Sequence, residues 1–202
     1  MANTTRKMAA MAMVMTLGMA ATAAADDELE TRETIVLSIE NKCGLPRPVV
    51  EAAQDTAVTV YDAIGVRLVW LTGRAAPPPE LAGALRLRIV LVGEIAEGRL
   101  LSQVSVPRVE RATVLAVAPV AARSAYLFCR RIAELARVSR IKALETALGR
   151  ALAHEIGHFV LPHMVHSDTG IMRARLDLHR VETSGFTEDQ GASIRTLLMA
   201  QK

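Results

Sequence analysis

A histidine-rich segment in the second half of the chain has the residue types and spacing most suited to metal chemistry. The run HEIGHFVLPHMVHSDTGIM occupies residues 154 to 172 and holds four of the five histidines. On a helix, His154 and His158 lie one turn apart on the same face, so both imidazoles can bind one metal ion. Glu155 lies beside them, where its carboxylate can accept a proton from a metal-held water without being a ligand. The spacing therefore predicts a Zn2+ site with Glu155 as the general base.

A purely structural interpretation of the same residues has to be weighed against the metal site. Two histidines on a polar helix face can be satisfied by ordinary hydrogen bonds and need no ion. The pattern H-E-x-x-H should occur by chance in on the order of one sequence in a hundred of this composition. Its place on a helix and the further histidines downstream, His163 and His166, favour the metal.

The helix that must carry the motif is predicted from apolar residues before and within it. A long helical region runs from near Ile132 to Leu161, with a possible break around residues 138 to 140. Pro162 ends it, because a proline disfavours the helical conformation in the residue before it. The core face carries Leu144, Leu148, Leu152, Ile156 and Phe159, and the histidine face carries the smaller Ala147 and Ala151. These alanines are expected to leave room for a metal.

The rest of the chain shows strand and helix patterns in a regular order. Apolar runs predict strands at residues 33–39, 66–71, 85–92, 113–118 and 125–129. Apolar residues from Val49 to Ile64 recur at helical spacing, and Gly65 is placed to end that helix. Thr187 and Gln190 have the spacing of a capping box and predict a final helix. The order predicts one compact domain of α/β class (α+β type) over residues 26 to 202.

The N-terminal residues have the layout of a secretory signal peptide. Arg6 and Lys7 precede an apolar run from Met8 to about Ala21, and small residues then lead to an expected cut after Ala25. Residues 1–25 would then be removed, leaving a secreted or periplasmic protein without stable membrane insertion. A retained membrane anchor is the alternative, but the run is short and rich in alanine for crossing roughly 30 Å of hydrocarbon.

Net charge and aromatic content indicate which partners are disfavoured, and the expected compartment bears on the state of the two cysteines. The formal net charge of +3 falls to +1 once the two basic residues of the leader are removed, and aromatic residues make up only 3%. The sequence therefore gives no sign of a base-stacking surface, which disfavours nucleic-acid binding. In an oxidising compartment Cys43 and Cys129 can form a disulfide, and the alternative is two separate buried thiols.

Residues 150 to 174 resemble the active site of the zincin metallopeptidases, and more narrowly that of the metzincins. Metzincins carry H-E-x-x-H-x-x-G-x-x-H followed by a Met-turn, and here HEIGH is followed by a histidine–serine pair and then GIM. The order of elements is also similar, since metzincin catalytic domains run strand, helix, three more strands and active-site helix. The resemblance implies a twisted, mostly parallel sheet with an active-site helix and a C-terminal helix. Two positions depart from the pattern, because Leu161 replaces the family's glycine and Met164 its third histidine.

A two-residue insertion restores the match to this signature. In matrixin-like metzincins a serine often follows the third histidine, and here His166 and Ser167 begin a similar run that ends at Met172. The resemblance then implies His166 as the third zinc ligand and Met172 as the Met-turn residue beneath the site. Three protein ligands leave a fourth position for water, as in catalytic zinc sites. The alternatives for the third ligand are His163, Asp168 and Glu182.

The resemblance implies an exported zinc metallopeptidase that acts on peptide or protein substrates. Zinc held by His154, His158 and His166 would polarise the scissile carbonyl and lower the pKa of its water toward about 7. Glu155 would take the proton and pass it to the leaving amine, while the substrate lies along an edge strand of the sheet. The alternative function is a non-catalytic zinc-binding module that holds a partner or buffers metal. A thiolate of Cys43 that blocks the zinc is a further alternative to the disulfide.

Overall fold

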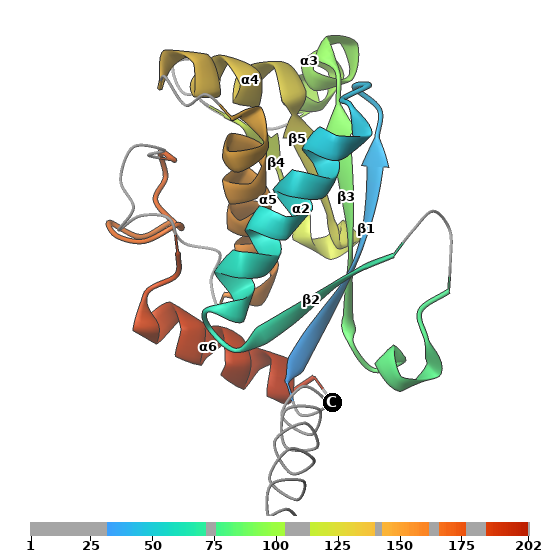
Figure 1. Ribbon diagram of the computed structural model, residues 1–202, viewed down its shortest axis with the longest axis vertical. Coiled ribbons are helices and arrows are strands. Elements are labelled where there is room, and N and C mark those ends of the chain that lie inside the picture. Colours follow the sequence, from blue (N-terminus) through green and yellow to red (C-terminus); the bar gives the residue numbers. More distant parts are fainter. Residues whose placement is uncertain are drawn as a thin grey trace, which may run out of the picture. The chain divides into compact units, whose positions relative to one another are not determined.

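A five-stranded sheet with helices packed against it forms the centre of the structure (Figure 1). The computed structural model describes residues 32–71, 76–103, 114–139, 143–161, 166–176 and 185–201. The expected signal peptide at residues 1–25 lies outside the described residues. Within the described ranges, none of the helices has the length and apolar character needed to span a bilayer.

The sheet is mostly parallel, which confirms the predicted α/β class. Its strands are β1 (Glu33–Asn41), β2 (Val66–Leu71), β3 (Leu85–Val92), β4 (Ala116–Val117) and β5 (Ser124–Phe128), in the spatial order β2-β1-β3-β5-β4. Strand β1 lies between β2 and β3, and its Ile35 is opposite Leu68 on one side and Leu85 on the other. The edge strand β4 pairs with β5 and is antiparallel to it. A strand was predicted at residues 113–118, and β4 covers only two of these residues. Residue 113 lies outside the described part.

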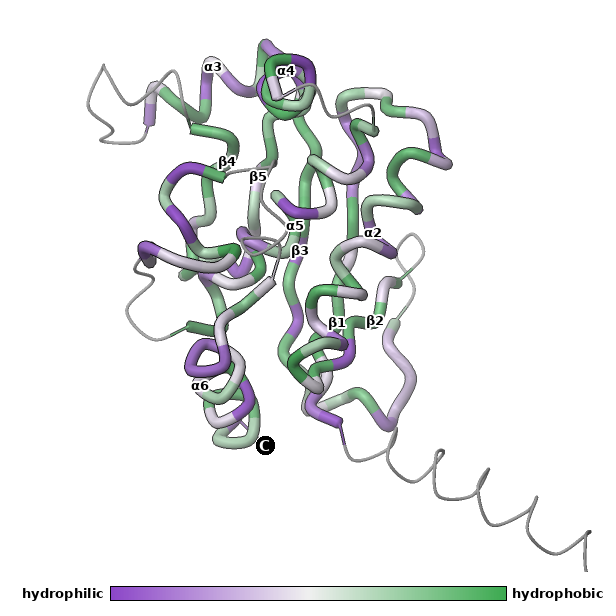
Figure 2. The backbone as a smooth tube through the Cα atoms, turned by 60° about the vertical axis from the view of Figure 1, so that its left-hand side comes forward, coloured by the Kyte–Doolittle hydropathy of each residue, from purple (hydrophilic) through white to green (hydrophobic). Residues whose placement is uncertain are grey.

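The helices follow the predicted positions with one addition. They are α2 (Arg47–Asp62), α3 (Glu94–Gln103), α4 (Cys129–Val138), α5 (Leu144–Val160) and α6 (Glu188–Met199), with short 3-10 turns at Pro79–Leu81 and Val120–Ala122. The expected break near residue 138 separates α4 from α5. Leu161 has an extended backbone directly after α5, as expected for a residue that precedes a proline. Figure 2 shows hydrophilic and hydrophobic residues alternating along α4 and α6, so each of these helices has one face that can pack on the core.

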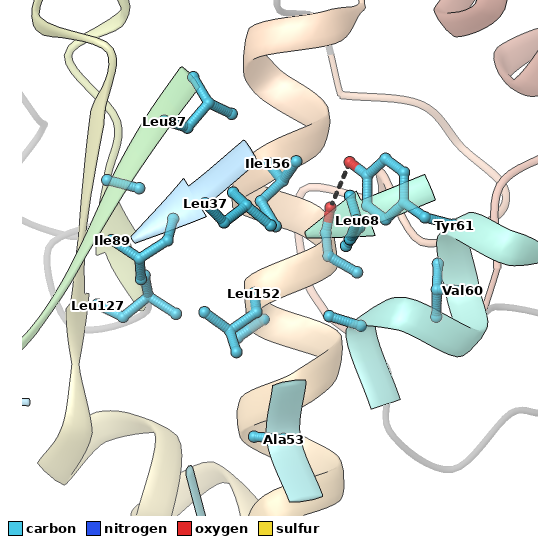
Figure 3. Packing of buried hydrophobic residues seen from close by; sticks show 14 of the residues in the cluster. Leu37, Ala53, Val60, Tyr61, Leu68, Leu87, Ile89, Leu127, Leu152 and Ile156 are labelled. Carbon is cyan, nitrogen blue, oxygen red and sulfur yellow. Dashed lines mark hydrogen bonds between the residues drawn. The ribbon is translucent and has the colours of Figure 1, made fainter. Parts of the chain in front are cut away.

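The main hydrophobic core lies between the sheet and the helices α2 and α5, which pack side by side (Figures 1 and 3). Because side chains of a strand alternate between faces, Leu87 and Ile89 of β3 point into this core. Val90 and Val92 of the same strand belong to a smaller cluster, which also contains Leu101 of α3. This second cluster covers part of the other face of the sheet, whereas Arg86 on the same face of β3 is exposed.

Helix α5, which carries the HEIGH motif, is buried on nearly every side. The alanines expected to leave room for a metal, Ala147 and Ala151, are 0% and 2% exposed and belong to the main core. Both alanines therefore pack in the core where α2 meets α5, and the room that they leave for a metal stays a prediction. A Cβ atom at Gly149 would lie only 2.4 Å from the Cβ of Thr56 on α2. The glycine thus permits the close approach that buries the alanines.

Helix α3 was not predicted, and an ion pair explains why its weak apolar pattern suffices. Glu97 is almost completely buried, and its carboxylate accepts a hydrogen bond of 2.5 Å from Arg131 on α4. Arg130 approaches the same carboxylate oxygen, and Arg131 also donates to the carbonyl of Val114. These contacts join α3 to α4 and to the chain before β4. A buried charge of this kind is tolerated because it is paired.

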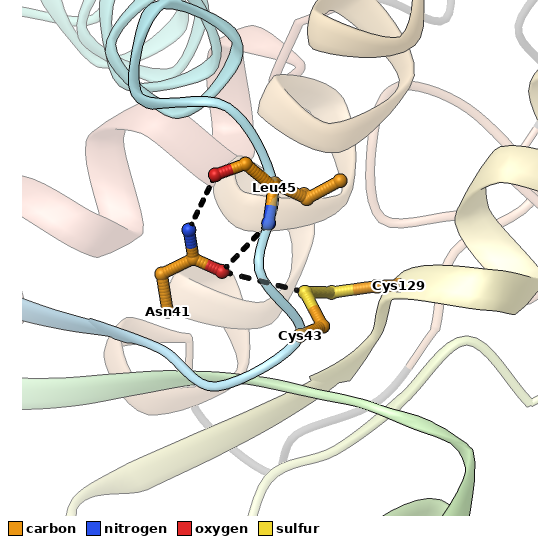
Figure 4. The surroundings of a disulfide bond; sticks show 4 residues. All are labelled: Asn41, Cys43, Leu45 and Cys129. Carbon is orange, nitrogen blue, oxygen red and sulfur yellow. Dashed lines mark hydrogen bonds between the residues drawn. A yellow bond between two sulfur atoms is a disulfide. The ribbon is translucent and has the colours of Figure 1, made fainter.

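A disulfide between Cys43 and Cys129 joins the loop after β1 to the first residue of α4 (Figure 4). This confirms the disulfide among the alternatives for the two cysteines, and neither thiol is free to bind a metal. Asn41 holds the same loop, since its side chain accepts a hydrogen bond from the Leu45 amide and donates one to the Leu45 carbonyl. The cross-link closes a long stretch of chain, which lowers the conformational entropy of the unfolded state.

Candidate metal centre

Three histidines come together at the C-terminal end of α5. The ring nitrogens available as ligands on His154, His158 and His166 all lie within 4.8 Å of one another. His154 and His158 come from successive turns of α5, and their Nε2 atoms are 3.1 Å apart. His166 comes from the loop after the helix, and its ring stacks on that of His154 with centroids 5.3 Å apart. The arrangement is that of a three-histidine site able to hold one metal ion.

The ring of His154 is oriented by a hydrogen bond from the loop. Its Nδ1 atom lies 2.7 Å from the carbonyl oxygen of Ile171, so Nδ1 carries the proton and donates it. The lone pair is then on Nε2, which points toward His158, as in the tautomer needed for a metal ligand. Burial lowers the pKa of His154 despite the opposing effect of the Ile171 hydrogen bond, and partial burial lowers the pKa of His166. Both shifts favour neutral imidazoles, the form that binds metals.

Glu155 follows the first of these histidines and is only 8% exposed. Burial away from water disfavours its charged form and raises the pKa of its carboxyl to about 8. Arginine and lysine side chains hold other carboxylates of the chain, such as Glu40, in the ionised form. A carboxyl group with a pKa near neutral can both take up and release a proton, which suits acid–base chemistry.

Met172 and Gly157 form a tight contact on another side of α5. Met172 is fully buried, and a Cβ atom at Gly157 would lie 2.5 Å from its sulfur and 3.2 Å from the ring of Phe186. The glycine of the HEIGH motif therefore lets Met172 lie directly against the helix, one residue before His158. The neighbouring Ile171 carbonyl holds His154, so this contact fixes the loop that orients a ligand.

Gly157→Ala should weaken both the fold and the histidine site, because the new methyl group has to displace Met172. Overpacking of this kind costs about 1–3 kcal/mol of unfolding free energy, partly offset by the better helix propensity of alanine. Gly98→Ala on α3 is the matched control, since a Cβ there meets nothing within 4 Å. Denaturant unfolding and zinc competition with a chelator measure the two effects. Equal stability and equal zinc affinity in both variants would show that Met172 does not hold the loop.

Two contacts of the site join residues far apart in the sequence and were not foreseen. The hydroxyl of Tyr61 on α2 donates to the carbonyl of Ala153, the residue before His154, over 3.2 Å (Figure 3). The Tyr61 ring also packs edge-on against Phe186, with centroids 5.0 Å apart. Helix α2 is thus tied both to the start of the motif and to the segment before α6. A lone tyrosine on a predicted helix carries no sequence signal for such contacts.

The remaining candidates for the third ligand differ in position. Asp168 is exposed, and among the described residues its carboxylate is not part of the group of close ligand atoms that His154, His158 and His166 form. His163 and Glu182 lie outside the described residues, and so does Met164, one of the two positions where the sequence departs from the metzincin signature. Of the expected ligands, the structure thus brings together His154, His158 and His166. Comparison with known proteins adds nothing to these contacts, since no family model and no curated protein sequence matches the chain.

Proposed function

We propose that this protein is an exported zinc metallopeptidase with a metzincin-like fold, in which His154, His158 and His166 hold the zinc. The observation that carries the proposal is the convergence of three imidazoles beside a buried glutamate. Two zinc ligands at 2.0–2.1 Å in tetrahedral geometry are roughly 3.3 Å apart. The 3.1 Å between the Nε2 atoms of His154 and His158 is close to this spacing. The donor set therefore fits zinc, and three ligands leave one position open.

Glu155 is the residue that we assign to proton transfer. Bound zinc supplies a Lewis acid and favours deprotonation of water at its open position. Glu155 accepts the proton of the attacking water and delivers it to the nitrogen of the leaving amine, so the peptide bond breaks without releasing an unstable anion. Burial raises the pKa of Glu155 to about 8 in the metal-free protein, and the positive charge of a bound zinc would favour the ionised carboxylate that accepts the proton. His154 keeps its proton on Nδ1, which donates to the Ile171 carbonyl, so its Nε2 atom is free to bind a metal.

The substrate is proposed to be an extended peptide, in line with the position of β4. This short strand is at the edge of the sheet and pairs on one side with β5. An edge strand has backbone groups that an added peptide strand can pair with. Export is supported by the disulfide between Cys43 and Cys129, because disulfides persist mainly in oxidising compartments.

Metal content and chelator-sensitive hydrolysis test the proposal together. The purified protein should retain about one zinc per chain after dialysis, because three histidine ligands form a complete catalytic site. It should cleave an unfolded protein or a peptide library, lose that activity with a chelator and regain it with added zinc. A folded preparation that retains no transition metal would contradict the proposal. Zinc binding without any cleavage would instead favour a binding module.

A further inference from the structure

A hydroxyl group next to the third histidine joins its loop to the C-terminal helix. Ser167 follows His166, and its Oγ donates to the carbonyl of Thr169 over 2.6 Å. The same Oγ accepts a 2.9 Å hydrogen bond from the side-chain nitrogen of Gln190 on α6. The Ser167 amide donates to the carbonyl of Met172, which closes the loop between these residues. Ser167 is thus fixed by two bonds within the loop and one from α6.

Gln190 has a second contact, at the N-terminus of its own helix. Its side-chain oxygen accepts a hydrogen bond from the Thr187 amide, and its own amide donates to the Thr187 hydroxyl. This pair is the capping box of α6. The oxygen of the Gln190 side chain therefore caps the helix, while the nitrogen holds Ser167. One side chain carries both functions because an amide offers an acceptor and a donor.

The loop held in this way supports two of the three histidines. His166 immediately precedes Ser167 in the sequence, and the Ile171 carbonyl orients His154. The start of α6 lies close to the loop, since the Ile171 amide donates to the carbonyl of Gly185 over 2.7 Å. A Cβ at Gly170 would lie 3.0 Å from that carbonyl, which leaves little freedom between the two segments.

We infer that Gln190 is a positioning residue for the metal centre and holds His166 and His154 in place through Ser167. This inference rests on the proposed function, since it assigns Gln190 a role toward the zinc ligands. The side chain does not contact a ligand itself. Its effect is to limit the movement of the loop, so that the ligands are arranged before the metal binds. Outer-shell partners of zinc ligands typically change metal affinity by about 10- to 100-fold.

Gln190→Glu separates the two contacts of this residue. A glutamate keeps the oxygen that caps α6 and is itself a common capping-box residue, but it lacks the N–H group that donates to Ser167. We expect zinc to bind about 10-fold more weakly in competition with a chelator. The melting temperature of the metal-free protein should stay close to that of the wild type. Gln103→Glu, an exposed position on α3, controls for the added charge and should bind zinc normally.

Two variants of Ser167 complete the test. Ser167→Ala should weaken zinc binding by a similar factor, and combining it with Gln190→Glu should weaken it little further, because both remove the same contact. Ser167→Thr keeps the hydroxyl and should restore most of the affinity. Normal zinc affinity in Gln190→Glu, or fully additive losses in the double variant, would overturn the inference while leaving the proposed function intact. A wild-type protein that binds no zinc would overturn the proposed function and this inference with it.

Discussion

Glu155→Gln is expected to abolish peptide hydrolysis while the protein keeps its metal and its fold. The amide has nearly the shape of the carboxyl group but cannot accept the proton, and loss of a positioned base typically costs about 10²- to 10⁴-fold in rate. Burial raises the pKa of Glu155 to about 8, so the folded state already favours the neutral form. A neutral amide should therefore not destabilise the metal-free protein at pH 7. Rates on one peptide library, measured at equal zinc content, check this result.

Glu145→Gln provides the matched control for this substitution. Glu145 lies in the first turn of the same helix, almost three turns before Glu155, and is partly exposed. The same chemical change there should leave both zinc content and rate unchanged. If Glu155→Gln cleaves as fast as the wild type, Glu155 is not the base, even where the metal is present. If neither protein shows chelator-sensitive cleavage, the zinc-binding module becomes the better description.

His154→Ala and His166→Ala are each expected to remove most of the bound zinc. Each change takes away one of three ligands, so the loss of affinity should exceed the roughly 10- to 100-fold that an outer-shell partner contributes. His154→Ala also leaves the Ile171 carbonyl without its hydrogen bond from the ring, which should lower stability by about 1 kcal/mol or more. Zinc content after dialysis and thermal unfolding of the metal-free variants measure these two effects.

His163→Ala separates the two histidines that compete for the third position. It should leave most of the zinc bound, because His166 is the one that the structure places beside His154 and His158. Loss of zinc from His163→Ala together with its retention in His166→Ala would show that the two-residue insertion is wrong. That result would leave the assignment of the metal site and of Glu155 as the base unchanged, and only the assignment of the third ligand would change.

Local patterns in the sequence were enough to predict most of the strands and helices. A short β-rich run marked β1, and alternating apolar residues marked β2 and β3. Helical spacing marked α2 and α5, because side-chain direction repeats every two residues in a strand and every 3.6 in a helix. The pairing of His154 with His158 is local in the same sense, since one helical turn brings them together. The capping box at Thr187 and Gln190 could also be predicted from the sequence, because it depends on four consecutive residues.

Other features depended on which segments pack together and were decided by the tertiary structure. Helix α3 has a weak apolar pattern and is held by Glu97 and Arg131, two residues whose proximity no local pattern reveals. The burial of Ala147 and Ala151 follows from the close contact of α2 with α5 at Gly149. The strand expected at residues 113–118 pairs with β5 over only two residues, since its length depends on that partner.

The candidate site also combines features that local sequence predicts with features that depend on tertiary packing. The pair His154 and His158 and the glutamate between them could be predicted from the sequence alone, because the backbone geometry of one helix fixes their relation. His166 could be proposed only from a resemblance across a loop that departs from the family's spacing, and the folded chain brings it within reach of the pair. The bond from Gln190 to Ser167 spans 23 residues and has no sequence signal. Such contacts form only when packed elements bring distant side chains together, so they depend on the whole core and not on neighbouring residues.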